Sequence, residues 1–451
     1  MTSRQYPSVA LHDYQKLSKQ ERHALLQRSE VDLQPFIDGA RSIIEAVKED
    51  GDKALVQFAQ KFDNATVTED AIAATPKDFD QAFDSLDNSL IEVLEYSAEN
   101  IRRFQQEQMP GDMWMKEIRP GVLVGERVTP IESVACYSPR GKGSFPSVTL
   151  MSAIPAVVAG VPNAVILTPP GADGQVDAAT LVAARIAGVE QVYKCGGVQA
   201  VAAAAFGTAA VPRCRKIVGP GNSWSVAAKR LLAGVIDPGL PAGPSETIVL
   251  ADASANPLIA ALDLIIESEH GSDSSAFIVT WDKQLAEQAI KAIPCYWDTM
   301  SEKLAGYSAD VLSGNSGGVI LMADAQSAYD FINEYAPEHC QILSEHPFEH
   351  LSFIRNASEI LLGQHAAGSI ANYMMGPNCV LPTSAAAHTY SPLGVNDFLK
   401  SSSIGHLTRQ GYDELAPKVH AFAQYEGFDA HANSVSSLRD DAFNGKLPIQ
   451  D

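Results

Sequence analysis

Short apolar segments alternate with alanine-rich segments through the middle of the chain, and this alternation limits the fold more than any other feature. From Val134 onward the apolar segments read VACYSP, NAVILTPP, QVYKCGG and KIVGPGN, and stretches such as VTLMSAIPAVVAG separate them. A short run without polar interruption suits a strand that is buried on both faces, and the separating stretches are long enough to form covering helices. The pattern therefore predicts a parallel, doubly wound α/β sheet.

A second alternation of the same kind follows, with TIVLAD, SAFIVTWD and GVILMAD as its apolar segments. Before both regions, residues 32–105 carry apolar side chains at three- and four-residue spacing, which is typical of helices. We therefore expect two Rossmann-like doubly wound domains side by side, with helical N-terminal and small C-terminal extensions. The expected parts are an N-terminal helical arm over residues 1–30, a first α/β domain over residues 31–132 and 246–390, a second α/β domain over residues 133–245, and a C-terminal helical segment over residues 391–451.

The chain is strongly acidic, with 54 Asp and Glu residues against 33 Lys and Arg residues and a formal net charge of −21. This charge repels phosphate backbones and anionic lipid, so nucleic acid and membrane surfaces are poor partners. No run of about 18 apolar residues occurs, and the first residues lack the apolar segment of a signal peptide. The six cysteines are far apart and form no CxxC pair, which is typical of reduced thiols. We therefore expect a soluble, cytoplasmic protein.

Three loops of small residues follow predicted strands of the second domain, at Arg140–Pro146, Gly196–Gln199 and Gly219–Asn222. Open α/β folds bind ligands at the carboxyl ends of their strands, so these loops indicate a site for a nucleotide or a similar ligand. The first loop alone is also compatible with a purely structural turn, because Pro146 stands where the dinucleotide fingerprint has its third glycine.

Two pairs of acid and imidazole side chains are candidates for chemistry. Glu267 and His270 are three residues apart at the end of a predicted helix, so they share one face and can bind zinc with two further ligands, or form a solvated pair. Glu338 and His339 follow Pro337 at an expected loop-to-helix junction and suit proton transfer. A histidine with a pKa near ~6.5 can accept a proton at neutral pH.

Ten short motifs resemble, in order, those of the histidinol dehydrogenase family. They read GKGSFPS, GGVQA, VGPGN, AGPSE, ESEHG, NEYAPEH, GPNCVLPT, SPLGV, DFLK and EGFDAH, and they extend from about residue 120 to residue 435. The resemblance implies an NAD-dependent, zinc-containing homodimer with shared active sites. It also implies the oxidation of a primary alcohol through an aldehyde to a carboxylate, with consumption of two NAD.

The resemblance implies a role for each matching position. Proton transfer would fall to Glu338 and His339, and NAD contacts to Tyr137, Gln199 and Asn222. The implied zinc ligands are Glu267, His270, Asn372 and His431, the last of them from the partner subunit. The implied substrate contacts are Ser245, Glu267, His270, Cys379 and Glu426, where Glu426 reaches across from the same partner.

Three of these positions differ from the family pattern. Glu267 stands in place of a glutamine and Asn372 in place of an aspartate, so ligand number and total ligand charge are unchanged and we expect zinc to be retained. Cys379 stands in place of a histidine that would face the substrate, and nothing in the sequence compensates for this change.

Three functional hypotheses therefore remain open. The first is histidinol dehydrogenase itself. The second is a paralogue that oxidises another polar alcohol, such as a hydroxylated sulfonate or an amino alcohol. The third is a protein that binds a metal or a nucleotide without turnover.

Overall fold

The computed structural model describes residues 5–28, 33–140 and 143–447. The chain divides into two compact units, of which the first comprises Met1–Met109 and Ile131–Phe398 and the second comprises Pro110–Pro130 and Leu399–Asp451. In the described part of the chain, no helix combines the length and the apolar character that a membrane span requires.

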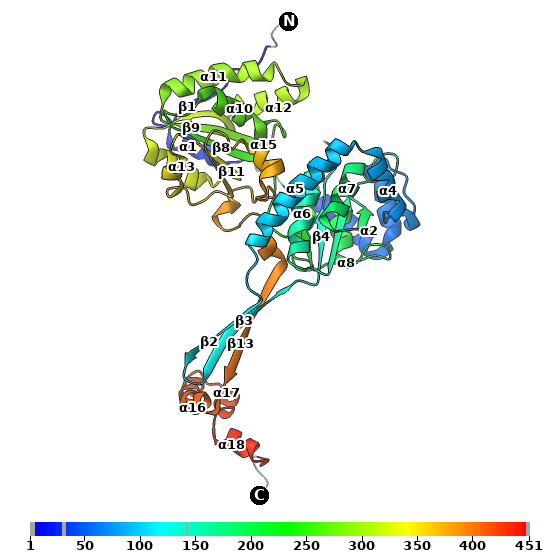
Figure 1. Cartoon of the computed structure of the whole chain (residues 1–451), viewed down its shortest axis with the longest axis vertical. Helices are drawn as coiled ribbons and strands as arrows, with labels where there is room; N and C mark the ends of the chain where they lie inside the picture. The colour runs from blue at the N-terminus through cyan, green and yellow to red at the C-terminus, as the bar shows by residue number, and fades with distance from the viewer. Residues whose placement is uncertain (1–4, 29–32, 141–142, 448–451) are drawn as a thin grey trace. The chain divides into compact units, whose positions relative to one another are not determined.

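The first unit contains a six-stranded sheet in which every neighbouring pair of strands is parallel (Figure 1). Its strand order is β1-β10-β9-β8-β11-β12. The strands are β1 (Leu11–Asp13), β8 (Glu246–Ala251), β9 (Ser275–Thr280), β10 (Gly317–Leu321), β11 (His339–Leu343) and β12 (Glu359–Leu362). The helices are α1 (Lys19–Leu26), α10 (Pro257–Ser268), α11 (Lys283–Trp297), α12 (Glu302–Leu312), α13 (Ala325–Tyr335) and α14 (Pro347–Leu351).

Alternate residues of the central strands enter two different hydrophobic clusters, one on each face of this sheet. Val249 and Ile278 pack with side chains of α10, α11 and α12, whereas Ile248 and Phe277 pack with side chains of α1 and α13. Since successive side chains of a strand point to opposite faces, these continuous apolar strands need helices on both sides. The expected doubly wound α/β architecture is confirmed for this sheet.

The first unit also contains a four-stranded parallel sheet with the order β6-β5-β4-β7. Its strands are β4 (Ser133–Tyr137), β5 (Asn163–Thr168), β6 (Val192–Lys194) and β7 (Lys216–Val218). Its helices are α6 (Pro146–Val158), α7 (Ala178–Ala187), α8 (Gly197–Phe206) and α9 (Ser223–Leu232). The chain moves outward from β4 to β6 and then returns to place β7 on the other side of β4. A topological switch point therefore lies between β4 and β7.

Of the helices before this sheet, the first two belong to its core and the other two pack on α6 and α7. In chain order, these helices are α2 (Gln34–Asp50), α3 (Asp52–Phe62), α4 (Pro76–Ser85) and α5 (Asn88–Glu107), with the 3-10 turn η1 (Glu69–Ala71). Ile44 of α2 and Leu55 of α3 share one hydrophobic cluster with Val165 and Ile217 of the sheet. This packing differs from the expected division, which groups residues 31–132 with residues 246–390. Hydrophobic periodicity identifies a helix, but it does not show which of two similar sheets the helix covers.

The N-terminal segment also differs from the helical arm expected over residues 1–30. Leu11–Asp13 forms β1, which pairs with β10 through Leu11 opposite Val319, and this strand is the edge of the six-stranded sheet. Three residues are too few to give a recognisable alternating pattern, so this strand had no sequence signal.

The second unit is a three-stranded antiparallel sheet followed by three helices. The strand order is β13-β3-β2, with β2 (Met113–Arg119), β3 (Val122–Pro130) and β13 (Leu399–Leu407). The helices are α16 (Arg409–Tyr425), α17 (Asp429–Asn433) and α18 (Ser437–Phe443). Residues 391–451 were expected to be helical, but within this unit they begin with the strand β13. This strand pairs with β3, whose residues were expected in the first α/β domain.

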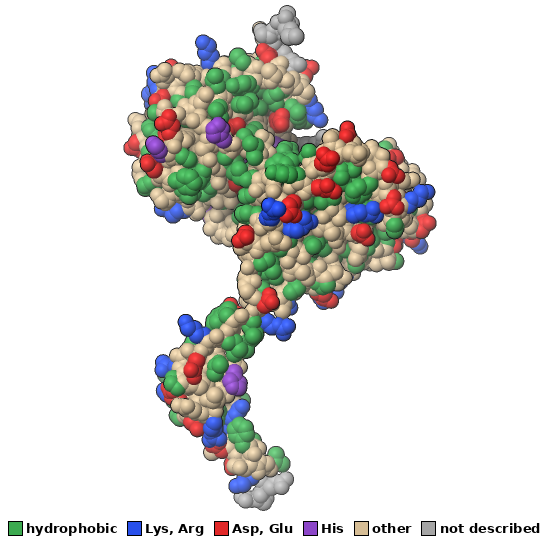
Figure 2. Space-filling model, viewed as in Figure 1, with side chains coloured by type: hydrophobic (Ala, Val, Ile, Leu, Met, Phe, Trp, Pro, Cys, Tyr) green, Lys and Arg blue, Asp and Glu red, His purple; other side chains and the backbone are tan. Residues whose placement is uncertain are grey.

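Apolar side chains lie on the surface of the second unit (Figure 2). Every residue of β2 is exposed, among them Trp114 at 51% and Ile118 at 60%, and Phe422 of α16 is exposed at 66%. An exposed apolar patch of this kind is typical of an interaction surface.

Candidate active site

His339 is the first residue of β11 and is buried. The preceding helix α13 ends at Tyr335, and Ala336 adopts a left-handed conformation with φ of 51° that turns the chain toward the strand. The expected loop-to-helix junction is therefore wrong, because the short apolar run after His339 forms a buried strand rather than a helix.

Three carboxylates surround the His339 imidazole. Nδ1 lies 2.7 Å from Oε2 of Glu359, the first residue of β12. Nε2 lies 3.8 Å from Oε1 of Glu338 and 3.9 Å from Oε1 of Glu267. One ring nitrogen is thus occupied by a hydrogen bond, and the other faces the two carboxylates expected to take part in chemistry.

The pKa values of this cluster depend on both burial and charge. Burial lowers the pKa of His339, but Glu267, Glu338 and Glu359 outweigh it and raise the value to about 10. Burial raises the pKa of Glu338 to about 8, against the opposing effect of His339. Burial also acts to raise the pKa of Glu267, yet His339, His270 and hydrogen bonds hold it below its usual value. His339 therefore holds its proton more tightly than the sequence led us to expect, and Glu267 is the ionised partner.

Three of the four expected zinc ligands lie together. Glu267 is near the end of α10, and His270 follows it with Nδ1 at 3.4 Å from Glu267 Oε2. Asn372 lies in the π-helical turn η2 (Ala371–Met375), directly after the short helix α15 (Gly368–Ile370), and its Nδ2 donates to Glu267 Oε1 at 3.0 Å. Asn372 Oδ1 is buried and has no hydrogen-bond partner in the described residues. A buried amide oxygen without a partner fits a cation ligand.

No group of three or more His, Cys, Asp or Glu side chains in the described ranges has the geometry of a metal site. The donor set found at Glu267 consists of one carboxylate, one imidazole and one amide oxygen. An amide oxygen is an accepted metal ligand, so this set offers three donors although only two belong to those four residue types.

Two of the expected substrate contacts, Ser245 and Cys379, border the same cluster. Ser245 is close enough to Glu267 for its side chain to help lower the pKa of that carboxyl. The thiol of Cys379 donates to Glu359 Oε1 at 3.8 Å, and its backbone nitrogen donates to the sulfur of Met151 at 3.3 Å. Burial and the neighbouring carboxylates raise the pKa of the Cys379 thiol, so it stays protonated.

Glu426 and His431 lie in the second unit. Glu426 is the C-cap residue of α16, and His431 lies in α17 with its ring centroid 5.1 Å from that of Phe428. Both residues are exposed. Their expected delivery from a partner subunit stays a prediction.

The three expected NAD contacts lie at the carboxyl edge of the four-stranded sheet. Tyr137 ends β4, and its hydroxyl accepts a hydrogen bond from the backbone nitrogen of Gly197 at 3.0 Å. Gln199 is buried in the first turn of α8. Asn222 is the N-cap of α9, where Oδ1 accepts from the nitrogen of Ser225 at 3.2 Å. The strand–loop–helix connections thus bring the three residues to the same edge, beside the switch point.

Glycine allows the loop after β7 to approach β4 closely. Gly219 has a φ of +107°, and a Cβ atom there would lie 2.2 Å from the carbonyl oxygen of Tyr137. Only glycine fits this position. Gly141 and Lys142 of the first glycine-containing loop lie outside the described residues.

Glu359 and a buried ion pair are the residues that sequence reasoning missed. Arg28 forms an ion pair with Glu246, with Nε 3.0 Å from Oε1, and the Glu246 backbone nitrogen donates to Glu338 Oε2 at 2.9 Å. The only available signal was a charged residue at the head of a short apolar run, as in EILL and ETIVLA. A charge at the start of a buried strand needs a partner, and that requirement could have identified both.

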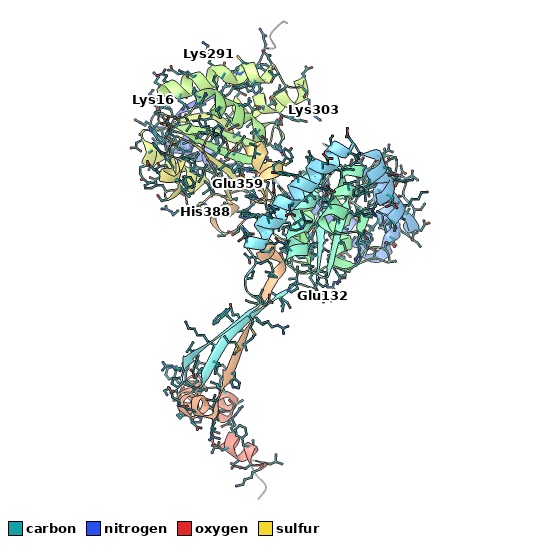
Figure 3. All side chains as sticks on the ribbon, in the orientation of Figure 1. Lys16, Glu132, Lys291, Lys303, Glu359 and His388 are labelled. Carbon is teal, nitrogen blue, oxygen red and sulfur yellow. The ribbon has the colours of Figure 1, made fainter. Side chains whose placement is uncertain are left out.

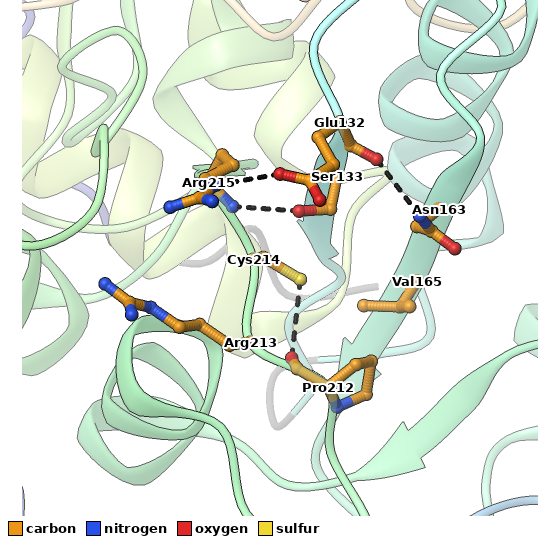
Figure 4. Close-up of a pocket in the computed structure, with 8 residues that line it drawn as sticks. All are labelled: Glu132, Ser133, Asn163, Val165, Pro212, Arg213, Cys214 and Arg215. Carbon is orange, nitrogen blue, oxygen red and sulfur yellow. Dashed lines mark hydrogen bonds and ion pairs between the residues drawn. The ribbon is translucent and has the colours of Figure 1, made fainter.

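Two of the cavities among the described residues lie in the first unit. One, of about 630 Å³, is lined by Glu359 and Asn378 among other residues, so it borders the imidazole cluster; Figure 3 labels Glu359. The other, of about 390 Å³, lies at the amino ends of β4 and β5, at the sheet edge opposite the expected nucleotide loops (Figure 4). It is lined by Glu132, Ser133, Asn163, Val165, Pro212, Arg213, Cys214 and Arg215.

The switch point with its close glycine turns is a ligand-binding edge of the α/β class, and the buried imidazole among carboxylates in the same unit is typical of an enzyme active site. The family model for histidinol dehydrogenase matches residues 26–439. The chain belongs to the histidinol dehydrogenase family, whose members are NAD-dependent oxidoreductases. The resemblance found in the sequence motifs is thereby confirmed, and the chain is a dehydrogenase.

Individual relatives agree with this assignment. A "Histidinol dehydrogenase homolog" of Colwellia psychrerythraea is 58% identical over 98% of this chain and 99% of its own length. A "Histidinol dehydrogenase" of Synechocystis sp. is 44% identical over 93% of this chain and 96% of its own. The crystal structure of histidinol dehydrogenase from Elizabethkingia anophelis has a TM-score of 0.90 at 30% identity and covers 98% of this chain and 100% of that one. Membership in a dehydrogenase family argues against the hypothesis of binding without turnover.

Proposed function

We propose that this chain uses NAD and zinc to oxidise a primary alcohol through a bound aldehyde to a carboxylate, as in the conversion of L-histidinol to L-histidine. The observation that carries the proposal is the buried His339, whose Nδ1 is held by Glu359 while Nε2 faces Glu338 and Glu267. An oriented imidazole next to a second proton-transfer group is what a two-step oxidation requires.

In the first step, His339 Nε2 removes the hydroxyl proton of the alcohol, and bound NAD would supply the hydride acceptor. The proton now held by His339 lowers the pKa of Glu338, so the ionised Glu338 then accepts a proton from water as the water adds to the aldehyde, which remains bound. His339 then releases the first proton to solvent and accepts the hydroxyl proton of the hydrate, and a second bound NAD would supply the hydride acceptor. Burial of both residues keeps bulk water away from the aldehyde between the two steps.

The donor set of this chain fits a zinc ion. Glu267, His270 and the unpartnered Oδ1 of Asn372 would supply three ligands, and His431 of the partner subunit would supply the fourth. Zinc would anchor the amine or hydroxyl of the substrate, with polarisation of the alcohol oxygen as a secondary effect. Because Glu267 is the largest of the charges that raise the pKa of His339, neutralising that carboxylate would return the imidazole toward the range of a base.

NAD would bind at the carboxyl edge of the four-stranded sheet. The switch point between β4 and β7 and the close approach of Gly219 to Tyr137 support this placement. Gln199 and Asn222 would then form hydrogen bonds with the nucleotide.

The second candidate is a paralogue that oxidises a different polar alcohol, such as a hydroxylated sulfonate or an amino alcohol. Cys379 favours it, because the family histidine is replaced by a thiol whose partner is Glu359. Four relatives at 53% to 58% identity also carry the name "Histidinol dehydrogenase homolog" or "Histidinol dehydrogenase homolog 2".

We further propose a homodimer with shared active sites and a cytoplasmic location. The exposed apolar residues of the second unit, such as Trp114 and Phe422, support contact with another copy. All six cysteines are free, which fits a reducing compartment.

A panel of alcohols tests the reaction. Zinc-loaded protein is incubated with NAD and with L-histidinol, hydroxylated sulfonates or amino alcohols, and NADH is followed by absorbance. Two NADH per substrate molecule with L-histidinol support the first candidate, and turnover confined to another alcohol supports the second. The His339→Asn variant is the control. Absence of NADH with every primary alcohol would contradict both candidates.

A further inference from the structure

We propose that Glu359 is the positioning residue of the His339 imidazole, and that Cys379 serves Glu359 rather than the substrate. The inference deepens the proposed function, on which it rests for the role of His339. It assigns roles to a residue that the family motifs did not indicate and to the position at which this chain departs most from the family.

The backbone fixes the distance between Glu359 and His339. The two residues are the first of β12 and β11 and are paired opposite each other in the parallel ladder. The backbone nitrogen of Glu359 also donates to the carbonyl oxygen of Glu338 at 3.0 Å. Since both side chains start from adjacent, hydrogen-bonded strands, their contact needs no adjustment of a loop.

The contact determines which ring nitrogen is available for chemistry. When Nδ1–H donates to Oε2 of Glu359, the Nε2 atom of a neutral imidazole carries the lone pair. Nε2 is also the atom that faces Glu338 and Glu267, at 3.8 and 3.9 Å. Glu359 therefore selects both the tautomer and the orientation that place the proton acceptor toward the reacting groups.

Cys379 contacts the second oxygen of the same carboxylate. Its thiol donates to Glu359 Oε1 at 3.8 Å, while Oε2 is taken by the imidazole. Neighbouring bonds hold Cys379 in place: Asn378 Nδ2 donates to the carbonyl oxygen of Met151 at 2.6 Å, and the Val380 nitrogen donates to Asn378 Oδ1 at 2.8 Å. Cys379, Glu359 and His339 thus form one chain of hydrogen bonds that ends at Nε2.

These hydrogen bonds give a physical reason why a cysteine, rather than the histidine of the family pattern, occupies position 379. The Glu359 carboxylate uses one oxygen for the imidazole, and its other oxygen needs a donor because the residue is only 7% exposed. A thiol supplies that donor. It is also smaller than an imidazole and leaves space beside the cavity of about 630 Å³ that Glu359 lines.

The first test observes the ring without requiring turnover. Full-length zinc-loaded protein with ¹⁵N-labelled histidine is studied by NMR, and the signals of His339 are assigned with His339→Asn. The native chain should show a hydrogen on Nδ1 in a strong hydrogen bond. Glu359→Gln, whose amide can donate as well as accept, should mix the two tautomers. The exposed Glu349→Gln is the matched control and should leave the signals unchanged.

The second test uses the alcohol that gives the fastest NADH production in the panel. Glu359→Gln should lower kcat by about 10- to 100-fold, with a much smaller change in KM. Cys379→Ser keeps a donor to Glu359, so its kcat should fall less than that of Cys379→Val, which should lower kcat by about 5-fold at unchanged KM.

Two results would overturn the inference. Ring signals of Glu359→Gln that match the native ones would remove Glu359 from its positioning role. A raised KM of Cys379→Val with native His339 signals would place Cys379 in contact with the substrate. If no alcohol were oxidised, the proposed function would fail, and the NMR comparison would still test the position of the ring.

Discussion

Asn372 donates through Nδ2 to Oε1 of Glu267 at 3.0 Å, and this bond leaves Asn372 Oδ1 buried without a partner among the described residues. The carboxylate of Glu267 and the amide of Asn372 are thus adjacent. A carboxylate and an amide can exchange places between these two positions only if both side chains reach the same metal ion. Glu267→Gln should lower zinc affinity about 10- to 100-fold, because the site loses its one carboxylate. The double variant with Asn372→Asp restores the charge and should recover the metal. Metal content after dialysis measures both, and loss of zinc from the double variant as large as from the single one would contradict the exchange.

His339→Asn should lower kcat about 10²- to 10⁴-fold, because the site loses its proton acceptor. Zinc content should stay native, since His339 is not among the expected ligands. Turnover of the best alcohol and metal analysis give the two values. His388→Asn is the control, because His388 is exposed and bonds only the carbonyl oxygen of Glu334 in the described structure. Substantial activity of the His339→Asn variant would exclude the imidazole as the base.

Mixing of two inactive variants tests the shared active site. His339→Asn and His431→Ala are denatured together and refolded. Each mixed dimer would contain one site with both native histidines, so random pairing should restore about a quarter of native activity. Each variant refolded alone is the control. No recovery, with mixed dimers demonstrated by size and mass, would mean that His339 and His431 act within one chain.

Asn222 caps a helix as well as being a predicted NAD contact, so a test must distinguish the two roles. Its Oδ1 caps α9 through the Ser225 nitrogen, so Asn222→Ala should cost about 1 kcal/mol of stability. Asn222→Ser keeps a capping oxygen but removes the amide. If the amide binds NAD, both variants should raise KM for NAD by about 5- to 10-fold, as expected for one lost hydrogen bond. A native KM in Asn222→Ser would show that the residue is only a cap.

Asp63 should make stability depend on pH. Burial raises its pKa to about 6, against the opposing charge of Arg140, and its Oδ2 has no partner in the described residues. The folded state holds this proton more tightly than the unfolded state, so the stability contributed by the protonated form is present below pH 3.8 and is lost as pH rises through about 6. Asp63→Asn should therefore be more stable than the native chain at pH 8 by about 1 kcal/mol, after allowance for solvent screening.

The difference between Asp63→Asn and the native chain should nearly vanish at pH 4. Urea denaturation at both pH values measures it. The exposed Asp84→Asn serves as control, and its difference from the native chain should not vary with pH. A constant difference for Asp63→Asn would contradict the raised pKa.

The sequence predicted most of the fold because its central strands are continuous apolar runs with helices between them. The packing of α2 and α3 on the four-stranded sheet was not predicted, since Ile44 and Leu55 would satisfy either sheet. The strand β1 was missed because Leu11–Asp13 is too short to show a period.

The sequence identified most residues of the candidate site but not their arrangement. Motif matching indicated Glu267, His270, Asn372 and His339, and the structure brings their side chains together. Glu359 could not be found in this way, because its role depends on the register of β12 beside β11. Such a register follows from long-range pairing, and no local pattern encodes it.

The second unit combines Pro110–Pro130 with the last part of the chain, and β3 has β13 as one of its two strand neighbours. During synthesis the β2–β3 hairpin leaves the ribosome long before β13 is made. This hairpin must therefore wait without its third strand through translation of Ile131–Phe398, the larger part of the first unit. Completion of the second unit, and any association of copies through it, consequently has to follow synthesis of both α/β sheets.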